Sequence, residues 1–76
     1  MLNVKEAWIV DQKTFGDLKH PFHIAIRTHD GRTFQSDGYQ NLEPADARMF
    51  KILDTGKASE RGFRESCKYG VDVLEP

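Results

Sequence analysis

The sequence predicts a small α+β domain: an antiparallel sheet, in the order β-β-β-α-(α)-β, with one main helix packed on one face. Two observations lead to this fold class. Residues 22–27 alternate apolar and polar side chains ahead of a glycine turn, which is typical of a half-buried strand entering a hairpin. Residues 45–53 instead repeat apolar side chains at helical spacing. The 76 residues leave room for one domain, residues 1–76.

The first strand is expected at residues 4–10, which are rich in β-branched and aromatic side chains. Trp8 and Val10 alternate with Ala7 and Ile9, so the pattern does not say which face is buried. This ambiguity favours a strand that is covered on both sides near its end. Residues 11–20 follow as a polar connection with a turn signal at Gly16-Asp17, either an extended hairpin or a functional loop.

The next two strands are expected to form a hairpin, with residues 32–37 returning beside residues 22–28. A two-residue turn would place Phe34 opposite Arg27 and split the apolar face. A three-residue loop, with Gly31 as a left-handed bulge residue, pairs Ile26 with Phe34 instead. The same register pairs Ile24 with Ser36, and on the polar face His23 with Asp37. The binary pattern therefore favours the three-residue loop.

A helix follows. Asn41 or Glu43 is a suitable N-cap, Pro44 fits the first turn, and Gly56 suits the C-terminal end. The expected buried stripe contains Ala45, Met49, Ile52 and Leu53, widened by Phe50, and the expected solvent-facing side contains Arg48, Lys51 and Asp54. Beyond the helix, a short helix or turn is expected near residues 59–66 and a final strand near residues 67–74.

Composition favours a protein of a reducing compartment. Cys67 is the only cysteine, so no intramolecular disulfide can form. The N-terminal residues lack the pattern of a signal peptide, and the longest strongly apolar run, residues 7–10, is too short to span a bilayer. We therefore expect a cytoplasmic protein that does not enter a membrane. Eleven Lys and Arg residues balance twelve Asp and Glu residues, without the basic excess of a dedicated nucleic-acid binder.

No constellation of residues predicts an enzyme, a cofactor or a metal site. His20, His23 and His29 lie within ten residues, but His23 and His29 are roughly 20 Å apart along an extended strand, too far to share one ion. Cys67 falls in an apolar alternation and is expected to be a small buried hydrophobe. The glycines are scattered and form no phosphate-binding loop.

The remaining surface feature is basic and aromatic. We expect a non-catalytic module that binds a partner protein complex, with Arg27, Arg32, Tyr39, Arg61 and Arg64 as the contact residues, because arginine and tyrosine are common in interface hot spots. The sheet edges of so small a domain also favour strand addition or a homodimer. The alternative is a small nucleic-acid-binding or regulatory protein that uses the basic face of the hairpin.

In size, and as a compact domain without an evident active site, the chain resembles the small inhibitors that phages and mobile elements encode against host machinery, including anti-CRISPR proteins. No sequence motif carries this likeness. It implies steric blocking of a nucleic-acid-handling host complex as the specific form of protein binding.

Overall fold

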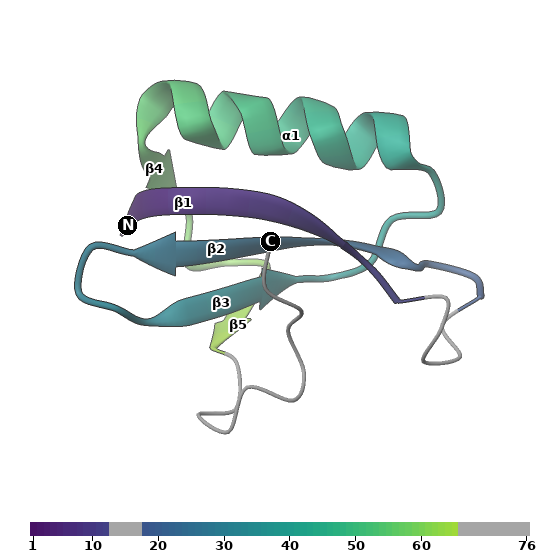
Figure 1. The fold of residues 1–76 in the computed structure, drawn as a ribbon, viewed down its shortest axis with the longest axis horizontal. Helices are drawn as coiled ribbons and strands as arrows, with labels where there is room; N and C mark the ends of the chain where they lie inside the picture. The colour runs from purple at the N-terminus through teal and green to yellow at the C-terminus, as the bar shows by residue number, and fades with distance from the viewer. Residues whose placement is uncertain (13–17, 66–76) are drawn as a thin grey trace.

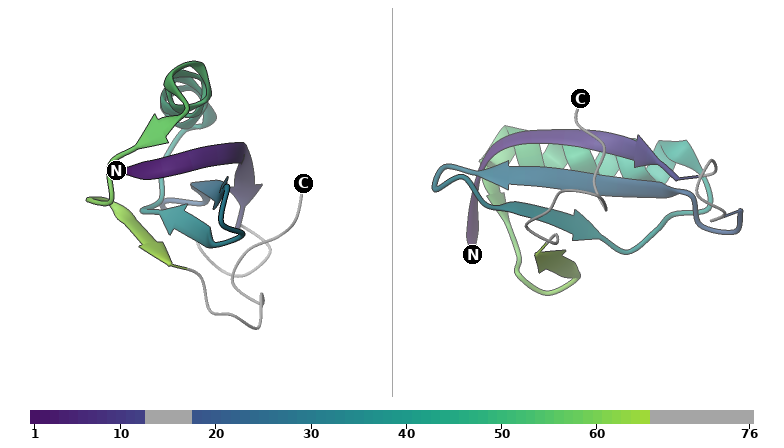
Figure 2. Two further views of the ribbon diagram at one scale, coloured as in Figure 1. Left: turned by 90° about the vertical axis from the view of Figure 1, so that its left-hand side faces the viewer. Right: turned by 60° about the horizontal axis from the view of Figure 1, so that its bottom comes forward.

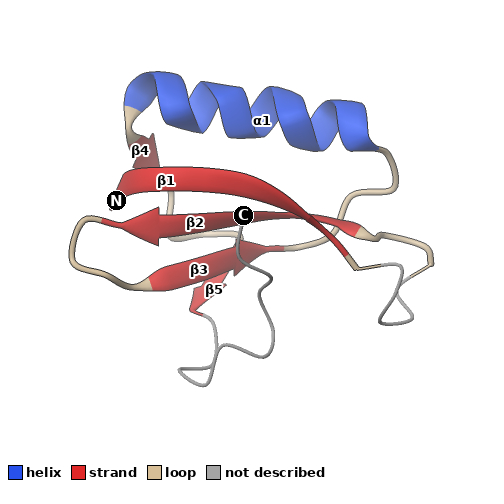
Figure 3. Ribbon diagram, in the orientation of Figure 1, coloured by secondary structure: helices blue, strands red, loops and turns tan. Residues whose placement is uncertain are grey.

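The computed structural model describes residues 1–12 and 18–65, and the α+β fold class is confirmed. One helix, α1 (Leu42–Thr55), runs across an antiparallel sheet in the direction opposite to the first strand (Figures 1 and 3). Within the described residues the sheet has the order β4-β1-β2-β3-β5. Its strands are β1 (Leu2–Asp11), β2 (Phe22–Thr28), β3 (Thr33–Ser36), β4 (Lys57–Ala58) and β5 (Phe63–Glu65). The predicted turn at Gly16-Asp17 lies outside the described residues.

The β2–β3 hairpin has the predicted register. Ile26 pairs with Phe34, and Gly31 adopts a positive φ of 87° in the three-residue loop. The backbone N–H of Thr28 donates to the Arg32 carbonyl at 2.8 Å and closes the loop. The Ser36 hydroxyl accepts the N–H of Ile24 at 2.9 Å, so a side chain takes the place of a ladder bond at the other end of the hairpin.

A β-bulge divides β1 into two parts. Val4 pairs with Thr28 and Glu6 pairs with Arg27, so three residues of β1 lie opposite two of β2. Because side chains alternate along a strand, the extra residue moves the later part of β1 by one step. Val4 then shares a face with Ile9, whose side chain would point the other way in a regular strand.

The main core lies between α1 and the face of the sheet that carries Ile24 and Ile26, here called the first face. Its buried members come from the helix and all five strands: Leu2, Val4, Ile24, Ile26, Phe34, Ala45, Met49, Ile52, Ala58 and Phe63. The αL conformation of Gly56, with φ 70°, ends the helix, and its N–H donates to the Ile52 carbonyl at 2.8 Å.

The helix differs from the prediction in its flanks. Leu53 and Phe50 were expected in the buried stripe, but they are 43% and 61% exposed. Arg48, expected to face solvent, is half-buried and lies over the Phe63 ring at 5.1 Å. The buried stripe is therefore narrower than the apolar pattern and is centred on Ala45, Met49 and Ile52. Asn41 is the N-cap, without a side-chain capping hydrogen bond.

The opposite face of the sheet, here called the second face, also contains a buried cluster, of Trp8, Val10 and Ala25. The prediction that His23 faces solvent is wrong. His23 is 7% exposed, and its Nδ1 lies 3.0 Å from the Ser36 carbonyl oxygen. The bulge explains the difference, because it places Val10 beside His23 on the face that the hairpin pattern alone marks as polar.

The sequence allowed either a second short helix or a turn after α1. In the structure this part of the chain forms the strands β4 and β5. β4 pairs with the start of β1, a turn follows at Arg61 and Gly62, and β5 pairs with β3. Residues 59–65 therefore contain a turn and a strand, and the second helix is absent from them. The predicted strand at residues 67–74, with Cys67, lies outside the described residues. In the views of Figure 2 the sheet curls below the helix, with β5 on the side away from it.

Candidate binding surface

Arg27 is held against the second face. Its guanidinium lies 5.3 Å from the centre of the Trp8 ring, and its Nη1 donates to the Glu6 carboxylate at 2.9 Å. The register positions both contacts, because Glu6 is the strand partner of Arg27 and Trp8 follows two residues later. A cation over an indole face and an ion pair together restrain this side chain, so Arg27 is anchored within its own sheet.

Tyr39 has a structural position. Its backbone exchanges hydrogen bonds with Phe22, at 2.7 Å from the Tyr39 N–H and 3.2 Å to the Tyr39 carbonyl. Its hydroxyl accepts a hydrogen bond of 2.8 Å from Nη1 of Arg48. Since Arg48 also covers Phe63, the Tyr39 side chain helps to close one end of the core beneath the helix. The sequence contains no local signal for this contact, which joins α1 to the segment after β3.

Arg32 and Glu65 form a two-point ion pair between the hairpin loop and β5. Nε donates to Oε2 at 3.1 Å and Nη2 to Oε1 at 2.8 Å. The guanidinium also lies 4.9 Å from the centre of the Phe34 ring. The hydrogen bonds from Arg32 lower the pKa of the Glu65 carboxyl, and the carboxylate in turn raises the pKa of Arg32.

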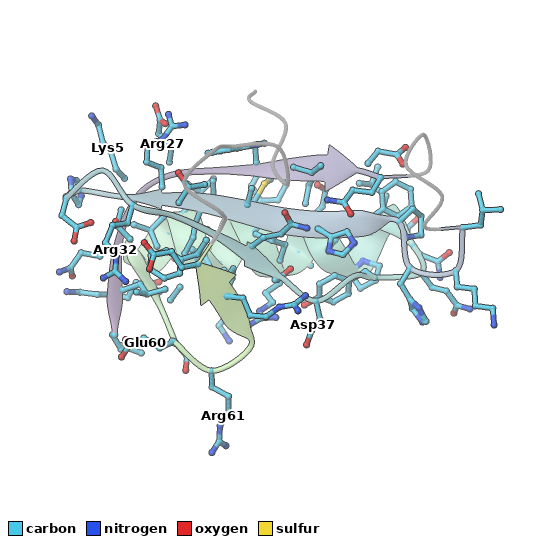
Figure 4. All side chains as sticks on the ribbon, turned by 90° about the horizontal axis from the view of Figure 1, so that it is seen from below. Lys5, Arg27, Arg32, Asp37, Glu60 and Arg61 are labelled. Atoms are coloured by element: carbon cyan, nitrogen blue, oxygen red, sulfur yellow. The ribbon has the colours of Figure 1, made fainter. Side chains whose placement is uncertain are left out.

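Arg61 and Arg64 are exposed. Arg61 lies in the turn before β5 and points away from the molecule in Figure 4. Arg64 lies in β5, with Nη2 4.0 Å from Oδ1 of Asp37 and both side chains more than 80% exposed. Together with Arg32 they form what we call the β5 margin: Arg32, Arg61 and Arg64, interspersed with Asp37, Glu60 and Glu65.

The structure thus brings three of the five expected contact residues to one margin of the sheet. Arg27 and Tyr39 are not part of it: Arg27 is paired with Glu6 beside β1, and Tyr39 is bonded to Arg48 under the helix. The exposed apolar side chains on α1 were missed by the sequence analysis. Leu42, Phe50 and Leu53 are 44%, 61% and 43% exposed. The helical pattern shows that a helix is apolar over a wide arc, but not how much of that arc its sheet covers.

One hollow of about 280 Å³ lies between the N-terminus, the loop after β2 and Glu60. Its walls carry charges of both signs, including the N-terminal ammonium 3.8 Å from the Glu60 carboxylate. Asp30 accepts a hydrogen bond from the Thr28 hydroxyl, which lowers the pKa of its carboxyl. Residues 1–12 and 18–65 contain no group of three or more His, Cys, Asp or Glu side chains arranged to hold a metal ion.

Comparisons with protein-family models, with curated proteins and with solved structures found no match to this chain. In the described part of the chain, no helix has the length and apolar character needed to cross a bilayer.

Proposed function

We propose that this protein is a non-catalytic module that binds another protein, and that the β5 margin is its contact surface. The observation that carries the proposal is the pairing of two of its three arginines with carboxylates. Arg32 faces Glu65 at 2.8 Å and Arg64 faces Asp37 at 4.0 Å. A surface of alternating charges discriminates between protein partners through complementary charges, which steer association and suppress wrong pairings.

The same observation makes nucleic acid the weaker candidate. Affinity for a phosphate backbone comes largely from unpaired basic groups that release counterions. On the basic face that suggested this alternative, Arg27 already contacts Glu6 at 2.9 Å, and Arg32 contacts Glu65. A phosphate would have to displace these carboxylates. Together with a net charge of −1, this favours a protein partner.

The resemblance to small phage-encoded inhibitors suggests a specific form of the proposal. In that form, the module covers a working surface of a host nucleic-acid-handling complex and blocks it sterically. A sheet margin suits this role, because blocking needs a complementary surface and no chemical step.

Affinity capture from lysate of the host cells, with and without nuclease, tests the proposal when it is followed by binding of the purified captured protein. We expect capture to survive nuclease. We also expect Arg61→Ala with Arg64→Ala to weaken binding of the purified partner by roughly tenfold or more, as loss of hot-spot arginines does. Lys51→Ala, on the exposed side of α1, is the matched control and should bind normally.

Two results would contradict the proposal. One is recovery of only nuclease-sensitive material, together with oligonucleotide binding that falls steeply between low and moderate salt; this would favour the nucleic-acid alternative. The other is a protein partner whose affinity is unchanged in the Arg61 and Arg64 variant, which would remove the β5 margin from the interface.

A further inference from the structure

The helix α1 exposes large apolar side chains along most of its length. Leu42, Phe50 and Leu53 are 44%, 61% and 43% exposed, and none of them belongs to the buried stripe of the helix. Leu42 is in the first turn and Leu53 in the last, about 17 Å apart along the helix axis. The exposed apolar residues therefore extend over about three turns, which is enough for contact with a second helix of similar length.

These three side chains project to one side of the helix. At about 100° per residue, Leu42, Leu53 and Phe50 fall within an arc of about 80°. The arc begins next to Met49 of the buried stripe, and it lies on the opposite side of that stripe from Arg48. In Figure 3 the sheet lies on one side of α1 only. The arc thus continues the apolar surface of the core outward into solvent.

Carboxylates surround this apolar arc. In the same projection, Asp46 lies between Leu53 and Phe50, and Glu43 and Asp54 lie within about 40° of Phe50 on its other side. Glu43 and Asp54 are exposed, and Asp46 is half-buried. Within residues 1–12 and 18–65, none of the three carboxylates has an ion-pair partner. We call the three apolar residues together with these three carboxylates the acidic flank.

The helix dipole accounts for Glu43 but opposes Asp54. Glu43 is in the first turn of α1, where a negative charge stabilises the helix. Asp54 is in the last turn, at the negative end of the dipole, and this turn contains no basic residue. A carboxylate at that position disfavours the helix. Asp54 and the dipole together make this end of the acidic flank electronegative, so a cation bound there would be favoured by both.

The two basic residues of α1 point in other directions. Arg48 and Lys51 project about 100° or more from each apolar residue of the acidic flank, and Arg48 donates to the Tyr39 hydroxyl at 2.8 Å. The flank therefore combines exposed apolar side chains with negative charge, which is complementary to a ligand that is both apolar and basic. Nucleic acid, an anionic membrane surface and a second copy of the same flank would all bring further negative charge and be repelled.

From this complementarity we propose that the acidic flank binds a basic amphipathic helix of another protein. Apolar side chains at helical spacing on that helix would pack on Leu42, Phe50 and Leu53, and lysine or arginine residues beside them would reach the three carboxylates. Phe50 makes the largest apolar contact, because it is the most exposed of the three and has carboxylates on both sides. This inference goes beyond the proposed function, since it concerns a different surface from the β5 margin.

A synthetic peptide tests the binding directly. The probe is a fluorescently labelled peptide of about 18 residues, made of leucine and lysine, with the leucines at helical spacing on one face. Titration with the purified chain, followed by fluorescence anisotropy, should give a Kd of about 100 µM or tighter, and added salt should weaken it because the carboxylates face solvent. A peptide with the same residues in scrambled order, and one with glutamate in place of lysine, should each bind at least about tenfold more weakly.

One pair of variants tests the apolar part of the site. Phe50→Ala removes the most exposed apolar side chain of the flank and should weaken peptide binding by roughly fivefold or more. Leu18→Ala is the matched control, because Leu18 is 78% exposed and lies outside α1, and it should bind the peptide as wild type does. Circular dichroism establishes that each variant is folded.

A second pair of variants tests the charges. Removing all three carboxylates of the flank should weaken binding by roughly tenfold and reduce its dependence on salt. This variant carries Glu43→Gln, Asp46→Asn and Asp54→Asn. The matched control makes the same change in net charge at the β5 margin, and should bind within about twofold of wild type. It carries Asp37→Asn, Glu60→Gln and Glu65→Gln.

Three results would overturn the inference. The first is a peptide that does not bind at millimolar protein concentration, and the second is an affinity that Phe50→Ala leaves unchanged. The third is an equal loss of affinity in the two charge variants, which would mean that net charge alone attracts the peptide. None of them bears on capture of a partner by the β5 margin. The variant with Arg61→Ala and Arg64→Ala should bind the peptide normally, which separates the two surfaces.

Discussion

At the scale of single residues, Gly38 is the glycine with the closest surrounding atoms among those that the structure describes. A Cβ atom at this position would lie 2.1 Å from the backbone oxygen of His20, closer than real Cβ contacts come. The sequence shows only a glycine near the end of the hairpin, since nothing local reveals that residue 20 passes over it. The absence of a side chain at Gly38 therefore allows the segment after β3 to lie against the segment before β2.

Gly38→Ala should destabilise the fold by about 2 kcal/mol or more, because backbone, and not a flexible side chain, blocks the added methyl group. Chemical denaturation measures the free energy of unfolding. Ala47→Gly provides a scale for an ordinary backbone change, at about 1 kcal/mol in an exposed helix position. An unchanged midpoint for Gly38→Ala would show that this close approach is absent in solution.

The Arg32–Glu65 pair predicts how stability responds to acid. The pKa of Glu65 is below its ordinary value of 4.5 in the folded state because Arg32 donates hydrogen bonds to the carboxylate. The stabilisation is therefore fully present above the pKa that the Glu65 carboxyl has in the unfolded chain. It is lost as pH falls through the lower pKa that this carboxyl has in the folded protein. Glu65→Gln should reduce the slope of stability against pH below about pH 4.5, as thermal melts across that range would show. Asp54→Asn, an exposed change on α1, should leave the slope as in wild type.

At the scale of elements, the hairpin was predictable and β1 was not. Only one loop length puts Ile26 opposite Phe34, so the binary pattern determined the register. In β1 the bulge changes the buried face part-way, and a pattern that assumes strict alternation cannot represent it. The strands β4 and β5 have two and three residues, too few for any periodicity. Their formation depends on partners far away in the sequence.

The candidate site also depends on contacts between residues that are far apart in the sequence. The residue types of Arg32, Arg61 and Arg64 were predictable as surface groups, but their meeting at one margin depends on β5 pairing with β3. Arg27 and Tyr39 were equally reasonable from sequence. Their intramolecular partners, Glu6 and Arg48, lie 21 and 9 residues away.

The helix offers a direct test of which apolar residues form the core. Met49→Ala removes a side chain that is 9% exposed and should cost about 2–4 kcal/mol. Leu53→Ala removes one that is 43% exposed, and should cost less than about 1 kcal/mol. Both are measured by chemical denaturation. Equal losses of unfolding free energy in the two variants would show that Leu53 belongs to the core, as the wider apolar stripe of the sequence predicts.

At the scale of the whole molecule, the two apolar clusters share the same two strands. β1 carries Ile9 toward the helix and Trp8 toward the second face, and β2 carries Ile24 and Ala25 in the same alternating way. Neither cluster can keep its packing if the pairing of β1 with β2 is lost. A chain of this size also buries too little apolar surface for one cluster to hold the sheet without the other.

We therefore expect a single cooperative unfolding transition. Trp8 is the only tryptophan, so its fluorescence reports the second face, whereas the ellipticity at 222 nm reports mainly α1 on the first face. The two signals should give coincident denaturant midpoints and slopes, as two-state behaviour requires. Val10→Ala, a change within the second-face cluster, should lower both midpoints together by an amount that corresponds to about 1–3 kcal/mol. If it lowers only the fluorescence midpoint, the second-face cluster unfolds separately from the helix, and the shared strands do not couple the two faces.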